Sequence, residues 1–184
     1  MYNLVNFQKH DYRDNLIFFV KFEEEYKTIM IVSEKVLKWA LNLYPPLFFQ
    51  RIWIKKFHKN FRGVDVKINK SLVNKNYNGS LFGGTIFSAT DPFYAILFDQ
   101  IMQRRGFKCL IWLKSASIQY IKPGKSDLFF RIEITDEMIE EAEKALKTQG
   151  KFIKAYPIKL YNTKNECCVV VSNEVYLRNK TFNK

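Results

Sequence analysis

Apolar residues at helical spacing mark two segments near the start of the readable part of the chain. They recur from Val36 to Leu43, preceded by Ser33 as a helix N-cap, and Pro45 ends this predicted helix. A short segment rich in aromatic and basic residues follows, and we interpret residues 47–57 as a second helix. Both segments are therefore predicted to be helical.

A change of period then predicts strands around one long helix. Residues 64–68 alternate between apolar and polar, the period of a half-buried strand. Residues 83–105 form the one long helical segment, and residues 136–149 form an amphipathic helix that opens after Thr135 and stops at Gly150. Further strands are predicted at 109–121, 128–134, 153–161 and 167–177.

This order of elements indicates an α+β fold in which one helix lies across a curled antiparallel sheet. A length of 184 residues with 47% hydrophobic residues suits one domain with one large core. Residues 1–32 mix charges and aromatics without a period, so we assign them to an N-terminal extension and residues 33–184 to the domain.

Net charge and cysteine content exclude only a few classes of protein. The formal net charge of +12 favours anionic partners, but lysine far outnumbers arginine, and only Arg104 and Arg105 cluster, so we do not expect a nucleic-acid site. Cys109, Cys167 and Cys168 form neither a disulfide framework nor a zinc motif. Without a recognisable secretory signal or membrane span, we expect a cytoplasmic protein with no metal.

Candidate chemistry concentrates between Asn76 and Asp91. Glycines at 79, 83 and 84 let the backbone approach a ligand closely, and Gly83 and Gly84 stand at the start of the long helix. The unpaired N–H groups of a helix start attract a carbonyl oxygen or an anion. Asp91 follows Gly83 by eight residues, within an otherwise apolar face.

These residues resemble the hotdog-fold thioesterases of the phenylacetyl-CoA thioesterase type. The motif of that family runs Asn, two residues, Gly, two residues, His-Gly-Gly, and then an acid eight positions after the first glycine of the pair. Asn76, Gly79, Gly83, Gly84 and Asp91 fall in register with it. Further segments are similar to one uncharacterised branch of the superfamily, a domain of unknown function, and carry the resemblance over residues 36–178: 41–46, 91–93, 111–117 and 122–124.

The resemblance implies a hotdog fold and a homodimer, possibly paired into a tetramer, that hydrolyses acyl-CoA or another acyl thioester without a cofactor. It implies that the Gly83 amide polarises the thioester carbonyl, that Asp91 of the other subunit acts as general base or nucleophile, and that Asn76 orients water or the acyl group. The expected substrate-binding residues are Gly79, Phe82, Gly84 and Lys114.

Three points stay open. Phe82 stands where those enzymes carry histidine, which leaves room for a non-catalytic hotdog protein that binds fatty-acyl ligands or serves as a scaffold. Pro92 after Asp91 either makes Asp91 the N-cap of a new helix or kinks a continuous one. The basic aromatic segment 35–56 also allows peripheral contact with an anionic membrane.

Overall fold

The computed structural model describes residues 32–182, which contain one six-stranded antiparallel sheet with the strand order β1-β2-β4-β5-β6-β3. The predicted N-terminal extension, residues 1–32, lies outside the described residues except for Val32. The strands are β1 (Ile52–Phe57), β2 (Gly63–Ile68), β3 (Cys109–Tyr120), β4 (Leu128–Glu133), β5 (Lys151–Asn162) and β6 (Cys167–Asn179).

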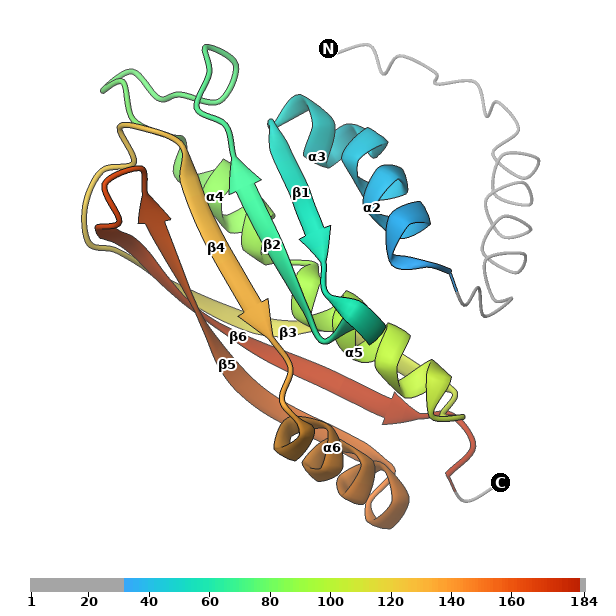
Figure 1. Ribbon diagram of the computed structural model, residues 1–184. Helices are drawn as coiled ribbons and strands as arrows, with labels where there is room; N and C mark the ends of the chain where they lie inside the picture. The colour runs from blue at the N-terminus through green and yellow to red at the C-terminus, as the bar shows by residue number, and fades with distance from the viewer. Residues whose placement is uncertain (1–31, 183–184) are drawn as a thin grey trace, which may run out of the picture. The chain divides into compact units, whose positions relative to one another are not determined.

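The helices lie on one face and at the ends of this sheet (Figure 1). The central helix is made of α4 and α5 and crosses the sheet, α2 and α3 lie beside the β1 edge, and α6 follows β4. Their bounds are α2 (Glu34–Leu43), α3 (Pro45–Phe49), α4 (Gly83–Thr90), α5 (Phe93–Arg104) and α6 (Asp136–Thr148), with a single 3-10 turn at Lys59–Phe61.

The core forms where α5 packs on the inward face of the sheet. Phe93, Leu97, Phe98 and Met102 of α5 have no exposed surface, and inward residues of every strand except the edge strand β3 are fully buried with them. Burying one such side chain stabilises the fold by roughly 1.5–3 kcal/mol, so this packing fixes the central helix firmly. The predicted α+β arrangement with a helix across a curled antiparallel sheet is confirmed.

Helix ends follow the local sequence signals. The Ser33 hydroxyl accepts a hydrogen bond from the Val36 N–H at 3.3 Å, and the Thr135 hydroxyl caps α6 in the same way. Gly150 has a φ of +70° just after α6, the left-handed conformation that favours glycine at a helix end. The predicted starts of α2 and α6 are thus confirmed.

The predicted helix over residues 47–57 is wrong. Only its first residues are helical, in α3, and β1 takes up the rest. A bulge between Ile54 and Lys56 shifts the strand register, so Ile52, Ile54 and Phe57 face the core at uneven spacing. This irregularity hides the period of two by which a strand is recognised from sequence.

Asn42 attaches α2 to the edge of the sheet. Its side chain is buried and bonds both backbone groups of one β1 residue: the amide donates to the Ile54 carbonyl at 3.1 Å, and the Ile54 N–H donates to Oδ1 at 2.8 Å. One side chain thus satisfies both backbone groups of Ile54 at the edge of the sheet, where a neighbouring strand would otherwise bond them.

Candidate functional site

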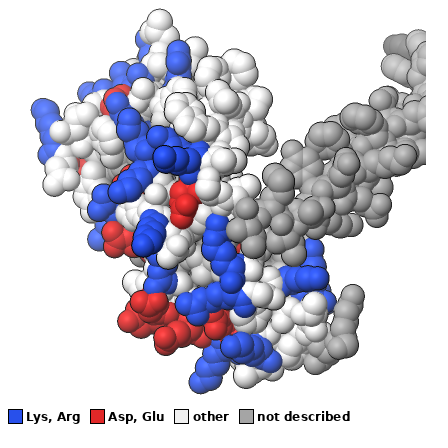
Figure 2. All heavy atoms as spheres, turned by 45° about the vertical axis from the view of Figure 1, so that its right-hand side comes forward, with Lys and Arg blue, Asp and Glu red and all other residues white. Residues whose placement is uncertain are grey.

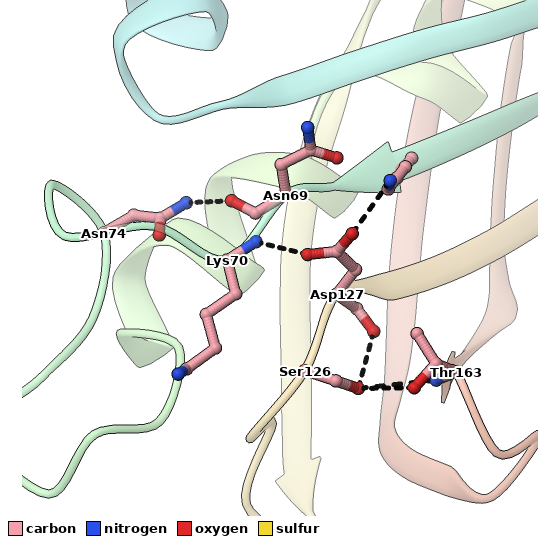
Figure 3. Close-up of polar contacts among 7 residues, drawn as sticks. Asn69, Lys70, Asn74, Ser126, Asp127 and Thr163 are labelled. Carbon is pink, nitrogen blue, oxygen red and sulfur yellow. Dashed lines mark hydrogen bonds and ion pairs between the residues drawn. The ribbon is translucent and has the colours of Figure 1, made fainter.

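Polar contacts tie down the loop between β2 and α4, which leads to the candidate site (Figure 3). The Lys70 N–H donates to the Asp127 carboxylate at 2.8 Å, and the Asn74 amide donates to the Asn69 carbonyl at 2.9 Å. Because Asp127 lies just before β4, these bonds join the loop to the sheet. The loop that leads into α4 is therefore fixed to the sheet.

Two asparagines of this loop, Asn74 and Asn76, make different hydrogen bonds. Asn74 is buried, and its carbonyl accepts the Phe82 N–H at 2.8 Å, which positions the residue directly before α4. Asn76 uses its side chain within the loop, where Oδ1 accepts the Ser80 N–H at 3.1 Å. Gly79 forms the turn between them and Ser80, with a φ of +74°. The role of Asn76 in orienting a substrate stays a prediction, and the anchoring role of Asn74 was not recognised from the sequence.

The first residues of α4 offer backbone donors close to two aromatic side chains. The N–H groups of Gly83 and Gly84 have no acceptor among the residues that the structure describes. A Cβ on Gly84 would lie 2.5 Å from the Phe82 ring, and one on Gly83 would lie 2.7 Å from the Tyr120 hydroxyl. A side chain at either position would have to displace one of these two aromatic side chains, so glycine preserves the observed arrangement at the helix start.

Tyr120 is a part of this site that the sequence analysis missed. It lies at the end of β3, and its hydroxyl donates to the Gly83 carbonyl at 3.1 Å. Burial raises the pKa of this phenol, so it stays protonated and able to donate at neutral pH. The two residues are 37 positions apart, and only the fold brings them together.

The central helix breaks at Asp91 and Pro92 without a change of hand. Asp91 (φ −57°, ψ −55°) and Pro92 (φ −85°, ψ −21°) both keep right-handed helical angles, and no side chain caps the start of α5. Proline has no N–H to continue the helical bonding, which accounts for the break. The N-cap interpretation of Asp91 is therefore wrong, because Asp91 ends α4 and Pro92 precedes α5.

The break is held from the sheet by Asn173. This β6 side chain is fully buried, and its amide donates to the Thr90 carbonyl at 2.7 Å. The bond crosses 83 positions in sequence. The break in the helix leaves the Thr90 carbonyl without its usual helical donor, and Asn173 supplies one instead. Without this bond, an unpaired buried acceptor would cost about 1–3 kcal/mol.

Asp91 itself is exposed at the side of the helix. Its carboxylate has no hydrogen bond or ion pair among the described residues. Desolvation by its surroundings raises the pKa of this carboxyl above the ordinary value for Asp. A carboxylate with a raised pKa and free oxygens is a better proton acceptor than an ion-paired one.

The predicted site residues lie in the loop before α4, at both ends of α4, and on β3. Phe82, Gly83 and Gly84 are contiguous at the start of α4. Lys114 lies on β3, where its ammonium group pairs with Glu174 at 3.0 Å. Its predicted role in substrate binding stays a prediction.

No metal-binding cluster of three or more ligand residues occurs within residues 32–182. Over the same residues, no helix has the length and apolar character needed to cross a bilayer. The three cysteines are all free thiols. The start of α4 presents the N–H groups of Gly83 and Gly84 beside the Tyr120 phenol, and the Asp91 carboxylate lies at the other end of this helix.

Solved structures share this fold at low sequence identity. A probable thioesterase of unknown function from Pseudomonas aeruginosa superposes with a TM-score of 0.71 at 15% identity, covering 80% of this chain and 97% of its own. A thioesterase from Haemophilus influenzae gives 0.60 at 12% identity, covering 83% and 94%. The PaaI protein of the phenylacetic acid degradation operon of E. coli gives 0.52 at 14% identity, covering 78% and 95%.

These similarities establish the hotdog fold, as the resemblance in the sequence implied. Comparison with curated protein sequences gives no match. The model of one family matches residues 33–177, which is most of the chain. The chain belongs to the family described as Domain of unknown function (DUF4442).

Proposed function

We propose that this protein hydrolyses acyl thioesters, with acyl-CoA as the substrate class, in a homodimer whose sites combine residues of both protomers. The observation that carries the proposal is the start of α4, where the N–H groups of Gly83 and Gly84 have no acceptor within residues 32–182. Such donors at a helix start bind the oxygen of a carbonyl as negative charge develops on it. Asp91 adds a carboxylate with a raised pKa on the same helix.

The spacing of these groups favours a site shared between two chains. Gly83 and Asp91 are eight residues apart, about 12 Å along a helix axis. One carbonyl group cannot reach both within a protomer. Two central helices that run antiparallel across a two-fold axis would bring Gly83 of one protomer beside Asp91 of its partner.

The free edge of the sheet supports such pairing. β3 is the last strand in the order, and it is 12 residues long. Leu110, Trp112 and Tyr120 on it are each about half exposed. A long free strand edge of this kind can pair with another strand, and a second copy of β3 would satisfy it.

In the proposed reaction, the Gly83 and Gly84 amides hold the thioester oxygen while Asp91 of the partner takes a proton from water. The water oxygen bonds to the carbonyl carbon, and the tetrahedral intermediate then breaks its C–S bond. The departing thiolate receives the proton from Asp91, so the products are a carboxylic acid and a thiol.

A second candidate function rests on Phe82. Its ring lies over Gly84 and can neither titrate nor donate a hydrogen bond. A protein that binds acyl ligands at this helix start without turnover would fit this residue.

An acyl-CoA panel with wild type and Asp91→Asn tests the catalytic proposal. Removing a general base lowers kcat by about 10²–10⁴-fold. Asp99→Asn is the matched control, since Asp99 lies two turns further along the same helix and burial also raises its pKa. Equal turnover by wild type and Asp91→Asn would remove Asp91 from the mechanism, and tight binding without turnover by wild type would favour the second candidate.

Mixing two inactive variants tests the shared site. Gly83→Ala places a methyl against Tyr120 and disturbs the donor, while Asp91→Asn removes the base. A heterodimer of the two has one site with both lesions and one intact site, so random mixing should restore roughly a quarter of wild-type activity. No recovery despite subunit exchange would place both groups in one protomer's site.

A further inference from the structure

Helix α2 has apolar side chains on two opposite faces. Leu37 and Leu41 pack against the core. On the other side, Val36, Trp39 and Leu43 are 57%, 60% and 66% exposed, and the helical repeat places them in one stripe. Scattered exposed apolar residues are common, but a contiguous stripe on a helix that is already anchored marks an interaction surface.

The stripe continues into α3 and the residue before it. Phe49 is 70% exposed, and its ring meets that of Phe48 edge to face at 5.5 Å. Phe48 in turn contacts Trp53 of β1 at 5.7 Å, which fixes these rings against the sheet edge. We call the six exposed residues the α2–α3 patch: Val36, Trp39, Leu43, Tyr44, Phe48 and Phe49.

Positive charge surrounds this patch. Five basic residues lie on or beside α2, α3 and β1, and none of them forms an ion pair with another described residue: Lys35, Lys38, Arg51, Lys55 and Lys56. The acid of α2, Glu34, is taken up by the Asn60 N–H at 2.8 Å. Figure 2 shows lysine and arginine side chains spread along the face turned forward, with acidic ones gathered in its lower part.

We propose that the α2–α3 patch docks on an anionic lipid bilayer. Aromatic and aliphatic side chains on the outward face of a helix match the interface between headgroups and acyl chains, where such a helix lies in the membrane plane. Lysines at the flanks keep their charge among the headgroups while their stems cover apolar surface. The charge selects an anionic surface, since each lysine near it contributes about 1 kcal/mol, or about fivefold in affinity.

Vesicle flotation with the full chain tests this proposal. Wild type should float with vesicles containing about a third phosphatidylglycerol and bind phosphatidylcholine vesicles at least about tenfold more weakly, with binding lost as salt is raised. Leu43→Glu places a charge in the stripe and should lower binding at least about tenfold. Leu72→Glu is the matched control, since it makes the same change at another exposed leucine, in the loop before α4, and should bind like wild type.

Thermal melting separates a folding defect from a binding defect. Because the Leu43 side chain points to solvent, Leu43→Glu should melt like wild type. Lys35→Gln combined with Lys38→Gln should weaken binding to anionic vesicles and leave binding to neutral ones unchanged. The proposal is overturned if wild type does not float, if both leucine variants bind equally, or if Leu43→Glu only dissociates a self-associated wild type. Equal loss of binding to duplex DNA, without vesicle binding, would make nucleic acid the partner instead.

Discussion

Removing the Asn42 side chain should destabilise the fold well beyond what a surface change does. Asn42→Ala takes away two hydrogen bonds, at 3.1 and 2.8 Å, and leaves the N–H and C=O of Ile54 unpaired. Ile54 is only 1% exposed, so water replaces these bonds poorly. At about 1–3 kcal/mol for each unpaired buried group, we expect the two groups together to cost roughly 2–6 kcal/mol in the free energy of unfolding.

Urea unfolding followed by circular dichroism measures this loss. The midpoint should fall while the m value stays unchanged, and the melting temperature should drop by roughly 2–4 °C for each kcal/mol. Gln50→Ala is the control, because it removes one hydrogen bond from the partly exposed Gln50 side chain to the Pro46 carbonyl and should cost less than about 0.5 kcal/mol. A loss for Asn42→Ala that does not exceed the control would refute the idea that this residue holds α2 on β1.

Three further outcomes are expected. Tyr120→Phe should keep the fold, with a loss below about 1.5 kcal/mol, and lower kcat for acyl-CoA hydrolysis, since only the hydrogen bond to Gly83 is removed; unchanged kcat would exclude a positioning role for Tyr120. The acid limb of the kcat/KM profile should have its midpoint above the ordinary Asp pKa of about 3.9, because Asp91 must be deprotonated to act as base and burial raises its pKa; a midpoint at or below 3.9 would argue against Asp91. Burial alone would raise the pKa of Asp65, but hydrogen bonds with Arg131 and His58 outweigh it and lower this pKa. Wild type should therefore lose its stability advantage over Asp65→Asn as the pH falls through that lowered value. A stability difference that stays constant down to about pH 2 would contradict this.

The sequence predicted elements whose signals are local. The starts of α2 and α6 follow from Ser33 and Thr135, each of which bonds an N–H three residues later. The central helix and β2 follow from uninterrupted hydrophobic periods. β1 was missed because the bulge after Ile54 breaks its alternation and because the strand is paired on one side by a side chain.

Of the candidate site, only the residues of the central helix could be predicted from the sequence. Two adjacent glycines and an acid at fixed spacing are visible along the chain, and Gly83 and Gly84 do stand at the helix start. Tyr120 and Asn173 act on this helix from 37 and 83 positions away. Hydrophobic periodicity reports only on neighbouring positions, so the contacts of Tyr120 and Asn173 with this helix can be recognised only from the fold.

The hydrogen bond from Tyr120 has a consequence for the neighbouring glycine. The carbonyl of Gly83 and the N–H of Gly84 belong to one planar peptide unit and point in opposite directions. By fixing the oxygen on one side, the phenol aims the hydrogen on the other, and it strengthens that hydrogen as a donor by polarising the amide. Tyr120 is also the last residue of β3, the strand at the edge of the sheet. A chain that pairs with this edge can therefore change how strongly the Gly84 N–H binds an oxygen.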